Sequence, residues 1–202
     1  PVKEICKLAH KSGSLCLVDG AQSVPHLPVN FKDIGCDFLV FSAHKMLGPT
    51  GIGALIIKKE LIEDLEPFMR GGGIISSVSY SNGNFNISWA SPPARFEAGT
   101  PHIAGALGFS AAVEYLEKMG MVEVRKYEEE LTRQTLKLLS EIEGVKILGP
   151  HDEKMRTGIV SFTIKGFDPH EIALILDSKG IAVRSGYHCA QPLHEFLGVK
   201  GS

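Results

Sequence analysis

The chain has 202 residues, of which 44% are hydrophobic and 22% charged, and its formal net charge at pH 7 is −2. These values are ordinary for a folded globular protein and exclude a disordered chain. No basic stripe indicates a nucleic-acid partner, and the apolar runs are far shorter than the roughly 20 residues that a membrane helix requires. We therefore expect a protein that binds neither nucleic acid nor membrane.

The four cysteines, Cys6, Cys16, Cys36 and Cys189, are widely scattered in the sequence. None forms a CxxC pair, so a structural zinc site is not expected and no metal is assigned. The length of the chain and the apolar residues beside Cys16 also argue against the disulfide framework of a small secreted protein. The expected location is a reducing compartment, the cytoplasm, with an organelle left open.

Both ends of the chain predict a longer protein. The chain starts at Pro1, inside a helical pattern in which Ile5, Leu8 and Ala9 share one face and after which Gly13 is the expected stop. The chain finishes without a closing element of structure. We expect an excerpt that covers the second half of a larger protein.

Three apolar runs follow in the first half of the chain, at 15–20 (LCLVDG), 37–45 (DFLVFSAHK) and 51–59 (GIGALIIKK). Continuous apolar strands separated by helical or loop connections are typical of a mostly parallel sheet that is buried on both faces. The segment 71–101 is rich in Gly, Ser, Asn and Pro. It predicts a long irregular loop of the kind that tends to be functional.

Two helices are predicted next, over residues 103–119 and 121–143, and the second is amphipathic. Its apolar stripe consists of Tyr127, Leu131, Leu138 and Ile142. After Gly144 the pattern is strand (VKILGP), strand (GIVSFTI), helix from Pro169 to Lys179 and strand (IAVRSG), which is typical of a small α+β unit.

The change of pattern predicts a domain boundary near residue 118. Residues 1–118 then form part of a large α/β domain, and residues 119–202 form part of a small C-terminal domain.

Polar residues follow two of the predicted strands at the point where each strand ends. Asp19 and Gln22 follow the first strand, and Ser42, His44 and Lys45 follow the second. In open α/β sheets, ligands bind outside the carboxyl ends of the strands. Singly, each residue has an ordinary explanation as a turn residue, a cap or a solvated loop lysine. Together they meet the needs of pyridoxal phosphate (PLP), which requires a lysine for a Schiff base, a carboxylate opposite its pyridine nitrogen and donors for its phosphate.

Two strings carry a family resemblance: VDGAQS at 18–23 and FSAHKMLGPTGIG at 41–53. They resemble the two adjacent cofactor segments of fold-type I PLP enzymes of aminotransferase class V. The resemblance implies that Lys45 is the Schiff-base lysine and that Asp19 is the partner of the pyridinium nitrogen. It also implies an α/β fold, in which part of the large PLP domain, a mostly parallel sheet with helices, is followed by part of a small α+β domain.

The resemblance implies further contacts to the cofactor. Gln22 would hydrogen-bond the ring oxygen, and Ser42 and His44 would hold the phosphate. A third matching segment is RFEAGTP at 95–101, whose threonine in this family reaches across the dimer interface to the partner's PLP phosphate. Thr100 has this role by resemblance, so a homodimer is implied. On its own, a threonine before a proline is an ordinary extended loop residue.

The segment IAVRSGYHCAQPLHEFLGV at 181–199 indicates the reaction, because it resembles the signature of group II (SufS-type) cysteine desulfurases and selenocysteine lyases. The resemblance implies that Cys189 takes the sulfur of L-cysteine as a persulfide and leaves L-alanine. Arg184 would bind the substrate carboxylate through two parallel hydrogen bonds. The implied function is supply of sulfur, through an acceptor protein, to iron–sulfur cluster assembly. The ordinary alternatives are a small buried hydrophobe for Cys189 and a surface ion pair for Arg184.

Two other functions stay open at this point. One is another class V PLP enzyme, such as a selenocysteine lyase or a kynureninase-like hydrolase, and the other is an excised domain with structural value only. His188 is not assigned as a base, because neighbours on an extended strand point to opposite faces. As an isolated polypeptide the chain is expected to show little or no desulfurase activity.

Overall fold

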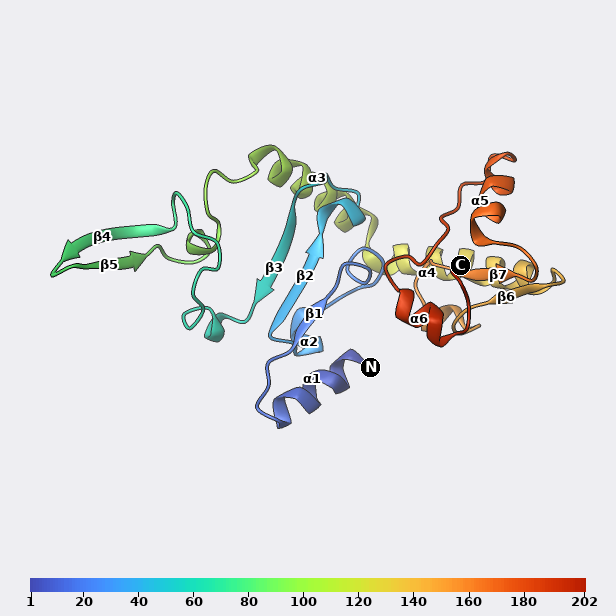
Figure 1. The fold of residues 1–202 in the computed structure, drawn as a ribbon, viewed down its shortest axis with the longest axis horizontal. Coiled ribbons are helices and arrows are strands. Elements are labelled where there is room, and N and C mark those ends of the chain that lie inside the picture. The colour runs from blue at the N-terminus through green and yellow to red at the C-terminus, as the bar shows by residue number, and fades with distance from the viewer. The chain divides into compact units, whose positions relative to one another are not determined.

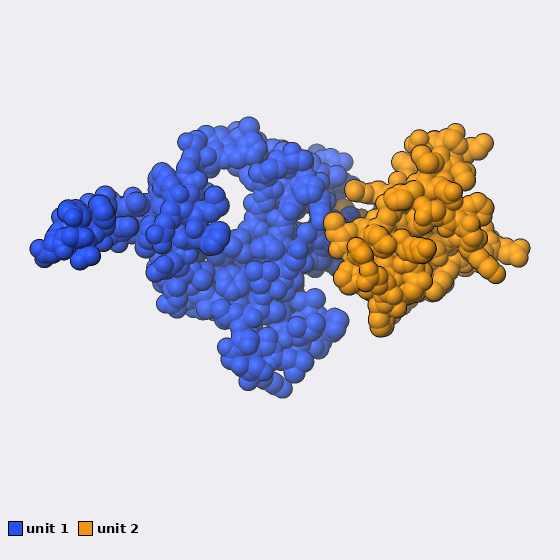
Figure 2. All heavy atoms as spheres, viewed as in Figure 1, with its two compact units in different colours: residues 1–121 blue, residues 122–202 orange.

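Residues 1–202 are all described by the computed structural model, in which the chain divides into unit 1, residues 1–121, and unit 2, residues 122–202 (Figure 2). The boundary predicted near residue 118 lies close to this division. No helix in either unit combines the length and the apolar character that crossing a bilayer would require.

A mixed three-stranded sheet forms the centre of unit 1 (Figure 1). Its strands, in spatial order, are β1 (Leu17–Asp19), β2 (Phe38–Ser42) and β3 (Gly53–Ile57). The β1–β2 pair is parallel, as the sequence predicts. The β2–β3 pair is antiparallel, which was not predicted, because residues 43–52 return the chain directly alongside β2 without a crossover helix.

One face of the sheet carries the core of unit 1. The buried side chains of Cys6, Cys36 and Leu39 form its centre, and α1 (Val2–Lys11) and α2 (Phe31–Ile34) contribute to it. Strand alternation places the side chains of β1 and β3 that do not join this core on the opposite face. There Leu17 and Leu55 are 58% and 51% exposed, so the strands are not buried on both faces as predicted. The physical reason is that the core of α1 and α2 covers one face only.

Helix α1 confirms the first predicted helix. It ends at Lys11, and Gly13, in the turn that follows, has a positive φ of 72°. Its predicted apolar face is not its buried face. Ile5 and Leu8 are exposed, whereas Cys6 is the helix residue that packs into the core. The 3.6-residue period identified the helix, but the position of the neighbouring strands decided which side is covered.

The segment 71–101 contains a β-hairpin where an irregular loop was predicted. Strands β4 (Ile75–Ser81) and β5 (Asn84–Trp89) pair antiparallel through the two-residue turn Asn82–Gly83. Both turn residues have positive φ, which is the requirement of a type I′ hairpin turn. The signal was present in the sequence as Asn-Gly between two runs of alternating apolar residues. Those apolar side chains are exposed, and they are Val78, Tyr80, Phe85 and Ile87.

Helix α3 (Ile103–Met119) has the predicted bounds, and α4 (Met121–Ser140) ends a few residues before the predicted end. The prediction that the apolar stripe of α4 is its packing face is wrong. Tyr127 is 65% exposed, and the other three members are exposed as well. The buried side chains of α4 are Thr132 and Leu136, because the rest of unit 2, to which α4 belongs, covers that side of the helix.

Unit 2 contains an antiparallel pair, β6 (Val145–Ile147) and β7 (Phe162–Ile164), and the helices α5 (Pro169–Asp177) and α6 (Gln191–Phe196). A capping box at Asp168 explains why α5 begins at Pro169. The strand predicted at IAVRSG does not form, because its backbone pairs with no neighbouring strand. Four short 3₁₀ helices complete the chain: η1 (Ala43–Lys45), η2 (Lys59–Leu61), η3 (Ala94–Phe96) and η4 (Glu153–Met155).

Candidate functional site

The carboxyl ends of β1 and β2 lie side by side, and each carries a predicted site residue. Asp19 is the last residue of β1 and pairs with Val40, while Ser42 is the last residue of β2. The Asp19 Oδ1 atom accepts a hydrogen bond from the Ala21 amide at 2.9 Å. This is the ordinary turn contact of an Asp at a strand end, and it holds the exposed carboxylate at the edge of the sheet.

Lys45 and His44 belong to η1, which follows β2 directly. The buried Ala43 anchors this turn, because its carbonyl accepts hydrogen bonds from the amides of Met46 and Gly48, both at 2.9 Å. The side chains of His44 and Lys45 are exposed. An amine and an imidazole are therefore presented on a backbone that is fixed at its first residue.

Glycines are required in this turn for steric reasons. A Cβ atom at Gly53 would lie 2.6 Å from the carbonyl oxygen of Phe41, and a Cβ at Gly48 would lie 2.9 Å from the carbonyl oxygen of Ala43. Both approaches are to backbone atoms, which cannot move aside cheaply. The glycine pattern of 41–53 thus has a structural explanation in the close return of β3 along β2.

A second lysine, Lys58, lies at the opposite edge of the sheet. Its Nζ atom lies 2.7 Å from Oδ1 of the buried Asp37, whose Oδ2 lies 2.8 Å from Nε2 of His10 and accepts the Cys16 amide at 2.7 Å. Burial by itself would raise the pKa of Asp37, but the bonds from Lys58, His10 and Cys16 outweigh it and lower that pKa to about 2. The bond to Asp37 raises the pKa of Lys58. Lys58 is thus engaged in a structural ion pair, and Lys45 is not part of this network.

Gln22 and Thr100 are both exposed. Gln22 lies in the turn that follows β1, in which the amides of Ser23 and Val24 donate to the Gly20 carbonyl. Thr100 lies in the segment just before α3. Upstream of it, Arg95 is buried and pairs with Glu63, in agreement with a structural role. The cofactor contacts of Gln22 and Thr100 stay predictions.

Cys189 lies in a turn of unit 2, just before α6, with its side chain exposed. It has φ of 59°, and His188 before it has φ of 52°. Two consecutive non-glycine residues in the left-handed region are uncommon. The chain is therefore not extended here, so the argument from alternating faces does not apply to His188. The His188 Nε2 atom lies 3.1 Å from the Ser202 carbonyl oxygen.

Arg184 lies upstream of this turn in the same irregular segment, and its side chain is exposed. Its neighbour Ser185 lies with its Oγ atom 2.8 Å from Nδ1 of His170, which joins the segment to α5. Arg184 and Cys189 are thus carried by one stretch of unit 2, while Asp19, Ser42 and Lys45 are carried by unit 1.

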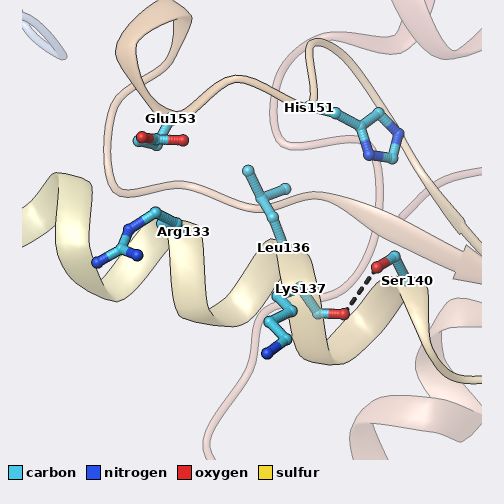
Figure 3. Close-up of a pocket in the computed structure, with 6 residues that line it drawn as sticks. All are labelled: Arg133, Leu136, Lys137, Ser140, His151 and Glu153. Atoms are coloured by element: carbon cyan, nitrogen blue, oxygen red, sulfur yellow. Dashed lines mark hydrogen bonds between the residues drawn. The ribbon is translucent and has the colours of Figure 1, made fainter.

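A cavity of about 230 Å³ lies beside the end of α4 (Figure 3). Leu136 points from the helix toward the segment that carries His151 and Glu153. None of the predicted site residues lines this cavity, and its charged groups are of both signs, so it favours no single ligand charge. Its lining consists of Arg133, Leu136, Lys137, Ser140, His151 and Glu153.

Two buried polar side chains, Asp37 and His194, were not anticipated from the sequence. Both are almost inaccessible to solvent and both make hydrogen bonds to residues of other segments. Their partners lie far away in the sequence or in an irregular stretch, so no periodic pattern could have revealed them. No group of three or more His, Cys, Asp and Glu side chains has an arrangement that could hold a metal ion.

The donor set at the carboxyl edge of β1 and β2 fits PLP. A lysine amine, a carboxylate, a hydroxyl and an imidazole come from two adjacent strand ends, in Lys45, Asp19, Ser42 and His44. These are the groups that bind the aldehyde, the pyridine nitrogen and the phosphate of this cofactor.

Known proteins resemble the chain over its whole length. The aminotransferase class-V family model matches residues 1–202. A probable cysteine desulfurase of Halalkalibacterium halodurans is 49% identical over 199 residues, which cover 98% of this chain and 47% of that protein. The apo structure of a cysteine desulfurase from Thermococcus onnurineus NA1 matches with a TM-score of 0.91 and 43% identity, and the match covers 99% of this chain and 49% of that one.

A more distant solved structure carries the cofactor. A C-DES mutant with glycine covalently linked to its PLP matches with a TM-score of 0.77 and 26% identity, over 92% of this chain and 49% of that one. The chain spans about half the length of the curated relatives it matches. Because the family model covers every residue, and the folds of solved relatives agree with it, the chain belongs to the aminotransferase class-V family.

Proposed function

We propose that the whole protein, of which this chain is about half, is a PLP-dependent cysteine desulfurase of the group II type that converts L-cysteine into L-alanine. The observation that carries the proposal is the exposed thiol of Cys189, held in a left-handed turn downstream of Arg184. The names of the similar proteins support this activity. We place the enzyme in the cytoplasm, where a free thiol stays reduced.

The residues of unit 1 hold the cofactor in this proposal. The amine of Lys45 would hold it covalently and, as a free amine, would accept the α-proton of the substrate. The Asp19 carboxylate keeps the pyridine nitrogen protonated, and Gln22 donates to the ring oxygen. Ser42 and His44 donate to the phosphate. Bound PLP supplies an electron sink for the negative charge that develops at the substrate α-carbon.

The residues of unit 2 bind the substrate and take its sulfur. The guanidinium of Arg184 holds the substrate carboxylate through two hydrogen bonds. The Cys189 thiolate attacks the sulfur of L-cysteine, so a sulfur–sulfur bond forms on Cys189 as the carbon–sulfur bond breaks. The electron pair of the broken bond stays with carbon, which takes up a proton and leaves as alanine.

Two partners belong to the proposal. The first is a second copy of the chain, toward whose cofactor the exposed Thr100 contributes its hydroxyl. The second is a protein that accepts sulfur from the Cys189 persulfide and delivers it to iron–sulfur cluster assembly. Its support is the exposure of Cys189, because a persulfide must be reachable to be passed on.

The test uses the purified full-length protein with PLP and L-cysteine. Alanine should form, and mass spectrometry of the unreduced protein should find one added sulfur on the peptide that contains Cys189. A parallel reaction with L-selenocysteine separates the two related activities. Alanine from selenocysteine alone would identify a selenocysteine lyase and contradict the desulfurase, and no alanine from either substrate would exclude both.

A further inference from the structure

The Cys189 turn rests on a buried histidine. His194, on α6, is 5% exposed, and its Nδ1 atom lies 2.9 Å from the carbonyl oxygen of Ala190. Its Nε2 atom lies 3.1 Å from the hydroxyl oxygen of Ser202. The ring also meets Tyr187 edge to face, with 5.7 Å between ring centroids. One imidazole thus touches residues on both sides of Cys189.

The contacts assign the tautomer of this histidine. A carbonyl oxygen can only accept a hydrogen bond, so Nδ1 of His194 carries the proton and donates it to Ala190. The Nε2 atom then accepts from the Ser202 hydroxyl. The Ala190 carbonyl also accepts the His194 amide at 3.2 Å, so side chain and backbone of one residue converge on it.

The turn requires support of this kind. His188 and Cys189 both have positive φ, a conformation that non-glycine residues keep only where the surroundings impose it. The ring of His194 lies 6.0 Å from that of His188, measured between centroids. It therefore lies against residue 188, directly before the thiol, and is hydrogen-bonded to residue 190, directly after it.

We propose that His194 is a positioning residue that holds the turn of Cys189 in the left-handed conformation from which the thiol reacts. This inference rests on the proposed function, in which Cys189 is the nucleophile. The main observation behind the inference is the Nδ1 contact to Ala190, because that contact fixes the carbonyl of the residue directly after the nucleophile. A nucleophile that is held loosely loses rate even when all of its chemical groups remain.

Three substitutions in the full-length, PLP-loaded protein separate the contacts. His194→Asn puts an amide nitrogen close to the Nδ1 position, His194→Gln puts one close to the Nε2 position, and His194→Leu retains neither. His151→Asn is the matched control, because His151 is an exposed histidine of unit 2 that lines the cavity beside α4. Each variant is measured for kcat and KM with L-cysteine, for PLP absorbance and for the rate at which iodoacetamide alkylates Cys189 without substrate.

The Leu variant should lower kcat about tenfold or more, with KM and PLP absorbance unchanged, and should change the alkylation rate of Cys189. Asn should restore most of kcat, whereas Gln should not. Equal kcat and equal alkylation in wild type, Leu and Gln variants would overturn the proposal. If the Leu variant does not fold, the Asn and Gln variants are compared with each other. Equal kcat and equal alkylation rates in these two variants would refute the positioning role of His194. If the wild type forms no alanine, the proposed function fails, and the alkylation rates alone judge the positioning.

A different observation carries a second inference, in unit 1. The Sγ atoms of Cys6 and Cys16 lie 3.2 Å apart, although ten residues separate them in the chain. Cys6 is 1% exposed, whereas Cys16, just before β1, is half-buried and reachable. A disulfide bond is about 2 Å long, so the sulfurs must approach by roughly 1 Å, which small side-chain rotations allow. Cys36 belongs to the same core.

We infer that Cys6 and Cys16 form a redox-sensitive pair that closes to a disulfide when hydrogen peroxide is present. The Cys16 sulfur takes OH from the peroxide as the oxygen–oxygen bond breaks, and one water leaves. The Cys6 sulfur then attacks that of Cys16, the sulfur–oxygen bond breaks, and a second water carries away the Cys6 proton. Both thiols are oxidised and the peroxide is reduced. Helix α1 is thereby tied to the base of β1, the strand that ends at Asp19.

Burial, with a smaller contribution from Cys16, raises the pKa of Cys6 to about 11. Since a thiolate is the attacking species, formation of the Cys6–Cys16 disulfide should be slow at neutral pH. It should accelerate as the pH rises toward the pKa of Cys6.

The test treats full-length protein with hydrogen peroxide, blocks remaining thiols with N-ethylmaleimide and digests it without reductant. Mass spectrometry should find the Cys6 and Cys16 peptides joined, reversibly with dithiothreitol, and the unfolding temperature should rise. Cys36→Ser should keep the link and Cys16→Ser should abolish it. An unlinked wild type, or a link between Cys16 and Cys36 instead, would overturn the inference; the wild-type spectrum decides even if a variant fails to fold.

Discussion

Two lysines at the ends of strands, Lys45 and Lys58, differ in whether neighbouring side chains already bind their amines. Lys45 and Lys58 both follow strands of one sheet, but β3 runs antiparallel to β2, which places the two lysines at opposite edges. Lys58 is bound to the buried Asp37 at one edge. Lys45 is exposed at the other edge, where Asp19 and Ser42 also lie. The direction of β3 therefore decides which of two chemically identical lysines is held in an ion pair and which stays exposed.

The first prediction concerns Lys45. Borohydride reduction of the full-length protein with PLP, followed by peptide mapping, should place the cofactor on Lys45. Lys45→Ala should lower alanine formation at least about a hundredfold, because the residue that we propose moves the α-proton is lost. Lys59→Ala is the control and should leave the labelled peptide unchanged. Label on Lys58 or Lys59 would refute the assignment.

The second prediction concerns Cys189. Cys189→Ser in the full-length protein should abolish sulfur release from L-cysteine, because a hydroxyl does not replace a thiolate as the sulfur acceptor. The absorbance of bound PLP should remain, since the residues proposed to bind the cofactor belong to unit 1. Selenide release from L-selenocysteine should fall less, because selenium leaves more readily. Unchanged desulfurase turnover, or loss of PLP absorbance, would contradict the role of the thiol.

At the scale of elements, Asp37 joins the ends of four of them. Its carboxylate, at the start of β2, contacts His10 near the end of α1, the amide just before β1 and Lys58 just after β3. Removing one partner of a buried ion pair leaves the other without compensation, which is costly. The network therefore fixes the amino edge of β1 and β2, opposite the edge that carries the proposed cofactor site.

The third prediction follows from the pKa of Asp37, which is lowered from its ordinary value of 3.8 to about 2. A lowered carboxyl pKa stabilises the fold fully above about pH 4, and this stabilisation is lost as the pH falls toward 2. Asp37→Asn in the full-length protein should reduce the free energy of unfolding at pH 7 by about 2 kcal/mol or more. Denaturant unfolding at several pH values measures this, with the exposed Asp33→Asn as control. Equal acid dependence in wild type and Asp37→Asn would contradict it.

At the scale of the whole molecule, the chain leaves much apolar surface uncovered. Its accessible area is 14051 Å². Two separate compact domains of the lengths of unit 1 and unit 2 would together expose only about 11,000 Å². The excess includes one face of the sheet, the α4 stripe and the apolar side chains of the β4–β5 hairpin. We propose that the remainder of the protein and a second copy cover these surfaces.

The fourth prediction concerns the chain as a separate polypeptide. Residues 1–202 expressed alone, with PLP and L-cysteine, should form little or no alanine, because exposed apolar faces favour association and an incomplete site holds its groups loosely. The same sample should bind a hydrophobic dye such as ANS more strongly than the full-length protein does. Turnover comparable to the full-length enzyme would show that the missing part is dispensable and that our expectation is wrong.

Local patterns in the sequence were sufficient to predict the family and most helices and strands, and to propose the site residues. The strand ends at Asp19 and Ser42, the helix over 103–119 and the start of α5 each depend on a few adjacent residues and their periodicity. The Asn82–Gly83 turn was equally readable, although composition suggested a loop. Such features are decided within one turn or one strand, so the chain order alone contains them.

Only the tertiary structure decided how these elements meet. The antiparallel return of β3, the buried side of α4, the 3.2 Å approach of Cys6 to Cys16 and the support of the Cys189 turn by His194 all join residues that local periodicity does not relate. Each depends on which neighbour covers a face or closes a loop. A sequence pattern can mark a face as suitable for burial, but the free energy of burial is realised only against the partner that the fold supplies.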